Sequence, residues 1–199
     1  MGSCGVKCWP LVAAAFLLAC APTAQADATV VVRDELLNAD FASSLDSGWT
    51  SSHVDYVGHS EIKPLPDGGA KVRKVYCGSA TLTQAVALDD HRVEFTTSAR
   101  LTAQANRYGY YSHAAIRLAY LDADGARLGE TWLYTLAGKT NWKDGPTVHR
   151  IKVPQSSLFQ DLELDVADEL RSNLPGVKPA DVRGIVITLE AFCSGRSAC

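Results

Sequence analysis

Aromatic and charged side chains that suit recognition of a hydroxyl-bearing ligand are concentrated between residues 106 and 142. The segment NRYGYYSH (106–113) holds three tyrosines around a glycine, and tyrosine is favoured in recognition loops because it is large, stiff and carries a hydroxyl. Trp132 and Tyr134 alternate along one stretch, so on a strand their rings would share a face about 7 Å apart. Flat rings stack on sugar C–H groups, and forked polar groups bind hydroxyls. The candidate ligand-binding residues are Tyr108, Tyr110, Tyr111, Arg117, Trp132, Tyr134 and Trp142.

Each of these residues also has a purely structural interpretation. Trp132 and Tyr134 would serve equally well as core or cross-strand fillers, and the tyrosine segment as a loop folded over one end of the domain. Trp142, in TNWKDG (140–145), is a loop aromatic open to the same two interpretations. Exposure of the rings distinguishes them, because a buried ring cannot stack on a ligand.

The stretch AYLDADGARLGETWLY (119–134) places two aspartates at the spacing of calcium ligands. An EF-hand loop counted from Asp122 needs an oxygen ligand at position 5 and a glutamate at position 12, where this sequence has Ala126 and Leu133. A hairpin turn explains the residues better, since aspartate side chains bond neighbouring amides and Gly125 adopts a positive φ at low cost. We predict a turn between two strands.

Catalytic patterns are weak in this chain. It has no GxSxG elbow, and its five histidines form no HExxH motif. Four glutamates follow strand alternation and are expected mostly to face solvent rather than form a glycosidase pair: Glu94, Glu130, Glu163 and Glu190. A non-catalytic protein is favoured. The enzyme least easily excluded is a polysaccharide lyase or hydrolase in which Tyr and His or Arg move the proton.

The first 26 residues resemble a signal peptide. Lys7 precedes the apolar run LVAAAFLLA (11–19), which is too short to span a bilayer, and AQA (24–26) forms a small-x-small cleavage site. The alternative is a lipobox, LLAC (17–20), which would make Cys20 a lipid anchor. Either route predicts export, to the periplasm or outside the cell. No later segment is apolar enough to cross a membrane.

The expected exported part, 27–199, is mildly acidic. Removing Lys7 leaves 18 of the 19 basic residues against 22 acidic ones, a net charge of −4. This balance argues against a nucleic-acid partner, which usually meets a clustered basic face. The basic stretch KVRK (71–74) is expected to be a solvated strand face.

Three cysteines remain after residue 26, and export makes a disulfide chemically reasonable. Cys77–Cys193 would tie a middle strand to the last one, whereas Cys193–Cys199 would pin only the tail. The sequence leaves both pairings open. A zinc site is not expected, because there is no CxxC pair.

Period-two alternation dominates the chain, which predicts mostly strands separated by short polar turns. One short helix is expected over 166–174, with Asp165 as its N-cap and Pro175 after its end. Strands at this spacing indicate an all-β, antiparallel two-sheet β-sandwich with one short helix. Residues 27–199 are expected to form a single domain.

Three segments resemble the galactose-binding-like β-sandwiches, a jelly-roll group that includes many carbohydrate-binding modules of secreted bacterial proteins. They are LLNADFASSLDSGWTSS (36–52), GSATLTQAVAL (78–88) and RVEFTTSARL (92–101). In the first of them, Phe41 and Trp49 are expected to plug the edge of the core.

The resemblance implies that the partner is a poly- or oligosaccharide. It also implies a possible structural calcium, for which Asn38, Asp40 and Glu190 stand in roughly suitable places. The alternative from another class is a cell-envelope domain that contacts protein and binds no sugar.

Overall fold

The computed structural model describes residues 36–105 and 110–195. The chain divides into two compact units, Met1–Arg33 and Asp34–Cys199, and every described residue belongs to the second. The expected signal peptide (1–26) and Cys20 lie outside the described residues. No helix in the described ranges has the length and apolar character needed to cross a membrane.

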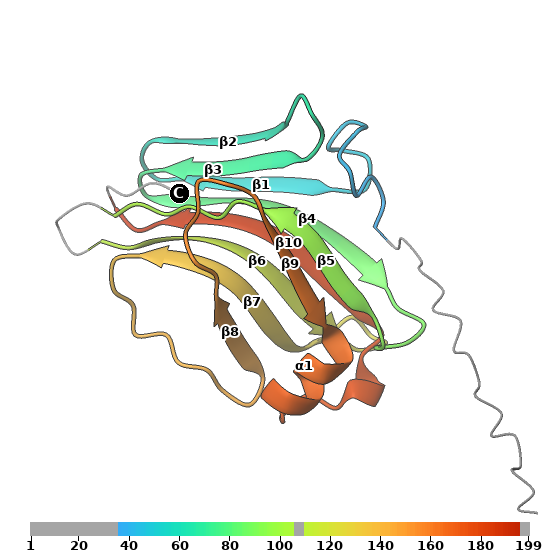
Figure 1. The fold of residues 1–199 in the computed structure, drawn as a ribbon. Helices are drawn as coiled ribbons and strands as arrows, with labels where there is room; N and C mark the ends of the chain where they lie inside the picture. The colour runs from blue at the N-terminus through green and yellow to red at the C-terminus, as the bar shows by residue number, and fades with distance from the viewer. Residues whose placement is uncertain (1–35, 106–109, 196–199) are drawn as a thin grey trace, which may run out of the picture. The chain divides into compact units, whose positions relative to one another are not determined.

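A six-stranded sheet forms one layer of the domain (Figure 1). From edge to edge its strands are β1 (Thr50–Asp55), β4 (Gly78–Ala87), β10 (Gly184–Cys193), β6 (Ser112–Leu121), β7 (Arg127–Ala137) and β8 (Val148–Lys152). All neighbours pair antiparallel except β7 and β8, which are parallel. The wholly antiparallel sheet expected from the sequence is therefore wrong at this edge, because the connection 138–147 crosses back along the sheet instead of forming a hairpin.

Two antiparallel ribbons form the second layer: β2 (His59–Pro64) with β3 (Ala70–Val75), and β5 (Glu94–Ala99) with β9 (Gln160–Asp165). Both ribbons contribute to the same core cluster, through residues such as Val72 and Leu164. A 3₁₀ turn, η1 (Pro179–Asp181), precedes β10. The expected all-β sandwich with one short helix is confirmed.

The helix α1 (Val166–Asn173) begins where the sequence predicts it. Asp165 caps it by accepting a hydrogen bond from the Asp168 N–H at 2.9 Å. Leu170 and Leu174 lie four residues apart and are buried in the core, so the helix is held by its apolar stripe rather than by its length.

One face of the six-stranded sheet, here called the inner face, carries the core. Leu82, Leu118 and Ile187 are buried there, and each contributes roughly 2 kcal/mol through burial. Trp49 is only 5% exposed and packs with Phe41 at 5.0 Å between ring centroids, as the sequence predicts. Trp49 is thus a packing residue that no ligand can reach.

The stretch between β6 and β7 is a turn, as predicted. Asp122 Oδ1 accepts hydrogen bonds from the amides of Asp124 and Ala126, at 2.9 and 2.8 Å. Gly125 adopts a φ of +78°, which a residue with a side chain rarely does. The Asp122 carboxylate is thus used to close the turn.

A chain of polar contacts joins the inner face to α1. The Tyr120 hydroxyl donates to Thr131 Oγ1 at 3.0 Å, and Thr131 Oγ1 donates to Glu169 Oε1 at 2.7 Å. His149 Nδ1, on β8, lies 2.8 Å from the same Glu169 oxygen. Burial raises the pKa of Tyr120 well above its usual value. This network lets a buried glutamate anchor the helix to β7 and β8.

The expectation that 71–74 is a solvated strand face is wrong at Lys74, which is fully buried. Its ammonium lies 2.5 Å from Asp55 Oδ1 and donates to the carbonyls of Val57 and Val75. A buried ammonium needs such acceptors, so Lys74 fastens β3 to β1.

Candidate functional site

The opposite face of the sheet, here called the outer face, gathers the aromatic residues. Side chains alternate between the two faces along a strand, and the pairing places Arg117 on β6 beside Trp132 on β7, and Trp132 beside Arg150 on β8. The strand β10 adds Glu190 and Phe192 to this group, and within the described ranges no strand of the second layer contributes to it. We call it the outer-face cluster; its members are Tyr111, His113, Arg117, Glu130, Trp132, Tyr134, Trp142, Arg150, Glu190 and Phe192.

Trp142 reaches the cluster from the loop 138–147. Its ring meets those of His113, Trp132 and Tyr134 edge-on, with centroids 4.9, 5.3 and 5.5 Å away. Edge-to-face contacts of this kind contribute about 1 kcal/mol beyond burial. The ring is half-buried, so one part of it packs and another part faces solvent.

The loop that carries Trp142 is fixed at both ends. Gly138, with φ +91°, turns the chain out of β7 where any Cβ would come within 2.4 Å of the Tyr110 carbonyl oxygen. At the other end Arg150 Nη1 donates to the Lys143 carbonyl at 2.8 Å, and Gly145 forms a bridge with Val148. Trp142 is therefore presented by a braced loop.

Trp132 is held by guanidinium groups from both neighbouring strands. The Cζ atom of Arg117 lies 4.5 Å from the ring centroid, and that of Arg150 lies 5.2 Å away. Cation–π contacts of partly buried arginines contribute about 0.5–2 kcal/mol each. The indole Nε1 is buried and has no hydrogen-bond partner among the described residues. Trp132 is thus held between two arginines and, like Tyr134 and Trp142, is half-buried.

Arg117 joins two carboxylates from different strands. Its Nη1 lies 2.7 Å from Glu190 Oε2 on β10, and its Nη2 lies 3.1 Å from Glu130 Oε2 on β7. Arg127 also contacts Glu130. Burial opposes ionisation of Glu190, but the adjacent His113 and Arg117 outweigh it and hold the pKa of Glu190 below its usual value. Glu190 is therefore ionised and paired near neutral pH.

His113 is buried among rings. It stacks on Phe192 with centroids 5.1 Å apart, and its Nε2 lies 3.5 Å from Glu190 Oε1, at the outer limit of a hydrogen bond. Neither ring nitrogen has a closer partner in the described ranges. This histidine is a wall of the cluster and lies too deep to act on a ligand directly.

The structure brings together five of the seven ligand-binding residues proposed from the sequence. Tyr111, Arg117, Trp132, Tyr134 and Trp142 all belong to the outer-face cluster. Tyr110 is 40% exposed and lies against Gly195, beside the cluster rather than in it. Tyr108 lies outside the described residues.

The sequence interpretation missed five members of the cluster: His113, Glu130, Arg150, Glu190 and Phe192. The expectation that the glutamates face solvent is right for Glu94 and Glu163 but wrong for Glu130 and Glu190, whose side chains are 9% and 10% exposed. Alternation placed all four on strands. Alternation could not show that Arg117, on the strand between β7 and β10, would pair with Glu130 and Glu190 and that both would be buried.

The three residues considered for calcium do not meet. Asn38 and Asp40 bond the backbone of their own loop, at Ser43 and Ala42. That loop lies on the inner-face side, where Gln84 holds the Leu37 and Gly48 carbonyls, whereas Glu190 points to the outer face and pairs with Arg117. No group of three His, Cys, Asp or Glu suited to a metal occurs in the described part of the chain.

The proposed Cys77–Cys193 disulfide is not formed in the structure. Cys77 has a free thiol in the turn before β4. Cys193 is buried on the inner face, where its Sγ lies 3.4 Å from the Lys74 carbonyl oxygen. The two cysteines are separated by strand geometry, since Cys193 pairs with Gly78 in the sheet and not with Cys77. The alternative partner, Cys199, lies outside the described residues.

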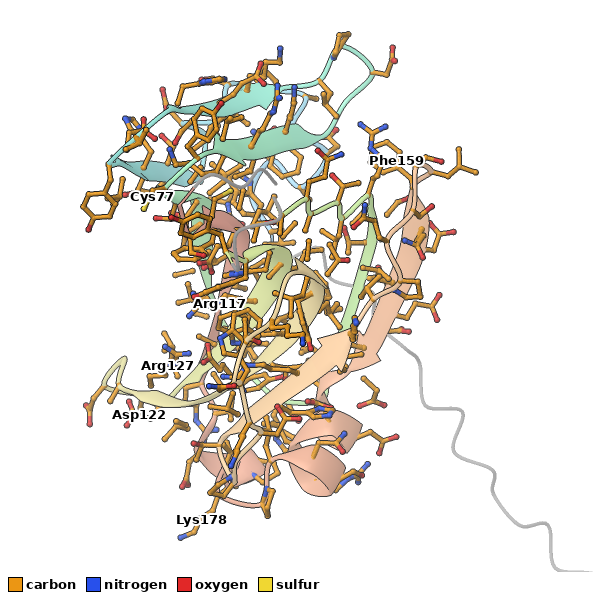
Figure 2. The ribbon with its side chains drawn as sticks, turned by 90° about the vertical axis from the view of Figure 1, so that its left-hand side faces the viewer. Cys77, Arg117, Asp122, Arg127, Phe159 and Lys178 are labelled. Carbon is orange, nitrogen blue, oxygen red and sulfur yellow. The ribbon has the colours of Figure 1, made fainter. Side chains whose placement is uncertain are left out.

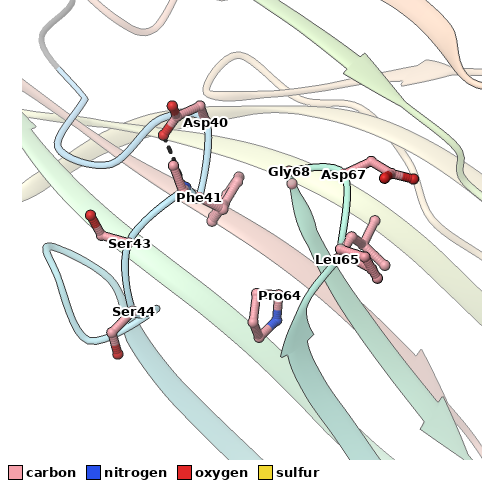
Figure 3. A pocket seen from close by; sticks show the side chains of 11 residues that line it. Asp40, Phe41, Ser43, Ser44, Pro64, Leu65, Asp67 and Gly68 are labelled. Atoms are coloured by element: carbon pink, nitrogen blue, oxygen red, sulfur yellow. Dashed lines mark hydrogen bonds between the residues drawn. The ribbon is translucent and has the colours of Figure 1, made fainter.

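A hollow lies elsewhere, between the loop 40–44 and the β2–β3 turn 64–69 (Figure 3). Its volume is about 830 Å³. Asp40 and Asp67 are its only ionisable lining residues, and the Asp40 carboxylate already accepts the Ala42 amide. The hollow offers mainly backbone and proline surface, so the residues with recognition chemistry are those of the outer-face cluster.

Comparison with protein-family models and with curated proteins finds no match. Among solved structures, the chain is similar to the enzymatically active domain of bacteriophage CBA120 tailspike protein 4, at 12% identity and a TM-score of 0.40. That match covers 83% of this chain but only 20% of the tailspike chain.

Carbohydrate-binding modules are also among the similar structures. TmCBM61, solved in complex with β-1,4-galactotriose, matches at 12% identity and a TM-score of 0.42, over 84% of this chain and 92% of that one. The family 11 module from Clostridium thermocellum, in complex with a β-1,3-1,4-mixed-linked tetrasaccharide, matches at 12% identity and a TM-score of 0.36, over 80% and 91%. The sequence motifs implied neighbours of this kind.

Proposed function

We propose that the chain is an exported, non-catalytic domain that binds a poly- or oligosaccharide on the outer face of its six-stranded sheet. The observation that carries the proposal is the gathering of Tyr111, Arg117, Trp132, Tyr134 and Trp142 on one sheet face. They come from two strands, β6 with its N-terminal end and β7, and from the loop 138–147, so their meeting is a property of the fold.

The chemistry of the face suits a sugar chain. Trp142 and Tyr134 are half-buried, and their remaining ring surface offers apolar contact for sugar C–H groups. The Thr83 and Thr188 hydroxyls, 3.3 Å apart, stand in the same row as Arg117 and extend a polar strip toward β1. Fixed rings with neighbouring polar groups lower the ordering cost of binding.

A second candidate function has its own observation. Four apolar residues exposed around the β1–β2 and β3–β4 turns form a separate surface: Val54, Tyr56, Val57 and Tyr76. The two turns are joined by a hydrogen bond from the Val57 amide to the Cys77 carbonyl at 3.3 Å. Exposed apolar groups of this kind mark protein-interaction surfaces, so this end of the sandwich is where a protein partner would bind.

Affinity electrophoresis against a panel of soluble polysaccharides tests the proposal. With the polysaccharide that retards the protein most, Trp142→Ala is expected to weaken binding at least about tenfold, equivalent to about 1.4 kcal/mol. The matched control is Phe159→Ala, because Phe159 is 56% exposed and lies under an arginine, Arg100, at the start of β9. Thermal unfolding of both variants shows whether the fold is intact.

Equal retardation of the wild type and Trp142→Ala, with both proteins folded, would mean that the outer face is not the sugar-binding surface. Loss of binding on Tyr76→Ala and not on Trp142→Ala, measured with an envelope extract, would favour the protein-interaction function. Release of reducing ends or of unsaturated products would favour a lyase or hydrolase.

The export part of the proposal has a separate test. Mass spectrometry of the protein made in a bacterial host is expected to give an N-terminus at Asp27. A diacylated N-terminus at Cys20 would replace cleavage after Ala26 by lipid anchoring.

A further inference from the structure

We infer that the outer face selects an anionic polysaccharide, one that carries carboxylate or other oxyanion groups along its chain. This inference rests on the proposed function and narrows it to a substrate class. It is carried by the arrangement of charge around the outer-face cluster.

Cationic side chains, three of them exposed and one part-buried, lie around the aromatic residues. We call Arg127, Lys143, Arg150 and Lys152 the basic rim. Lys152 pairs with Tyr134 across β7 and β8 and shares its face, and Lys143 follows Trp142 and receives a hydrogen bond from Arg150 at its carbonyl. Arg127 lies at the start of β7, where burial and the charge of Arg117 together lower its pKa.

The carboxylates of the same face are withdrawn from solvent. Glu130 and Glu190 lie beneath Arg117 and Arg127, with side chains 9% and 10% exposed, whereas the Arg127 side chain is 46% exposed. Among the described residues, no carboxylate lies within ion-pair distance of Lys143 or Lys152, since neither forms a salt bridge. A ligand approaching the rings therefore meets positive charge.

Within the described residues, one exposed acid forms an ion pair with the rim. Asp144 is 51% exposed and lies 3.3 Å from Arg150 Nη1. The rim thus presents three exposed cations, Arg127, Lys143 and Lys152, beside the part-buried Arg150, in a chain whose residues 27–199 carry 18 basic and 22 acidic side chains. This local excess runs against the sign of the whole chain.

The interior of the cluster has the same bias toward donors. Trp132 Nε1, Arg117 Nε and Arg150 Nε are buried N–H groups without an acceptor in the described ranges. The carboxylate oxygens nearby are already engaged by guanidinium groups. Because donors exceed acceptors, the cluster complements a ligand rich in acceptor oxygens and holds no spare negative charge that would repel one.

The arginines and the lysines of the rim would have different roles in binding the ligand. Planar guanidinium groups bind carboxylates in a fixed geometry, whereas ammonium groups on long stems attract charge without fixing it. Exposed charges separated by more than about 8–10 Å are screened at physiological salt, so the attraction acts only on groups close to the rim. The ligand's charges must therefore recur along the part that lies over the rings.

A pair of polysaccharides with one backbone tests the inference: polygalacturonate and its fully methyl-esterified form. We expect the purified protein to bind polygalacturonate at least about tenfold more tightly, with the difference shrinking as salt rises from about 0.05 to 0.2 M. Dextran sulfate is tested beside them. If the protein also binds dextran sulfate, the preference is for negative charge in general; if it does not, the preference is for carboxylates.

The double variant Lys143→Gln, Lys152→Gln removes two exposed ammonium groups without touching the ring contacts. It is expected to weaken polygalacturonate binding about three- to tenfold and to leave the methyl ester unchanged. Lys178→Gln is the control, because Lys178 is an exposed lysine next to η1, away from Arg117 (Figure 2).

The outcomes separate the two proposals. Equal or tighter binding of the methyl ester, lost on Trp142→Ala, would overturn charge selection and leave carbohydrate binding standing. Retardation by none of the polysaccharides would overturn both. Equal, lysine-dependent binding of duplex DNA would also overturn the inference, because the rim would then attract polyanions without recognising sugar.

Discussion

The outer face of the six-stranded sheet and the solvent side of the β5–β9 ribbon are both exposed strand surfaces, yet their residues differ in every respect. The ribbon presents Glu94, Thr96, Ser98, Asp161, Glu163 and Asp165. It has acids without bases and no aromatic ring among its six outward residues. The outer face instead carries rings, paired arginines and buried glutamates. Figure 2 labels Arg117 on this face and Phe159 next to the start of β9.

The ribbon shows what the sandwich itself requires of an exposed strand. Short polar side chains suffice, because the inward residues such as Phe95 and Leu164 supply the packing. The rings of Trp132, Tyr134 and Trp142 are therefore not demanded by the fold. Their presence on one face, fixed by arginines, is what an interaction site needs.

The largest expected effect that separates the two surfaces is that of Arg117→Ala. The substitution removes the guanidinium that pairs with Glu190 and Glu130 and leaves both carboxylates buried. Removing one partner of a buried ion pair lowers the free energy of unfolding by about 3 kcal/mol. Urea unfolding followed by fluorescence measures it. On the ribbon, Glu163→Ala is expected to change the free energy of unfolding by less than about 0.5 kcal/mol.

The control for Arg117→Ala is Arg100→Ala, which removes an arginine that also lies over an aromatic ring but pairs with no buried carboxylate in the described ranges. Similar losses for the two variants would mean that the arginine–carboxylate pairing on the outer face is no stronger than a surface contact, and the contrast between the two surfaces would disappear.

An intermediate effect is expected on the dependence of stability on pH. The pKa of Glu190 is lowered in the folded protein, so its contribution is complete above its unfolded value, about 4.3, and is lost as the pH falls through the folded value. Below about pH 5, the free energy of unfolding of the wild type should therefore fall more steeply than that of Glu190→Gln, measured as urea midpoints in the same buffers. Parallel profiles would contradict this account of the pair.

The smallest effect concerns charge at the surface. Asp144→Asn removes the acid that pairs with Arg150 and is expected to strengthen polygalacturonate binding about two- to threefold, with stability changed by less than about 0.5 kcal/mol. Glu163→Gln makes the same change of charge on the β9 ribbon and should leave binding unaltered. Equal gains from both variants would attribute the effect to net charge alone.

Much of the fold could be predicted from local patterns. Alternation located most strands, Asp165 and Pro175 bounded the helix, and the DADG turn followed from its own side chains. The strands β1 and β2 were less visible, because both carry mainly polar residues and β1 is exposed throughout. The parallel pairing of β8 was invisible, because its sequence alternates as an antiparallel strand would.

The site was predicted in part, for a physical reason. Residue type singled out Trp132, Tyr134 and Trp142, because large rings are conspicuous wherever they stand. The status of Glu190 depended on which strands flank β6, since only the order β10-β6-β7 brings two glutamates to Arg117. Pairing between strands far apart in the sequence is not encoded in the period of any one strand.

The edge strand β8 connects the outer-face cluster to the helix α1. Its five residues face both ways: Arg150 holds the Trp142 loop on one side, and His149 holds Glu169 of α1 on the other. A shift of this strand would loosen the helix and the aromatic loop together. A ligand on the outer face that restricts the motion of Trp142 is therefore expected to slow amide hydrogen exchange in α1, which lies on the other side of the sheet.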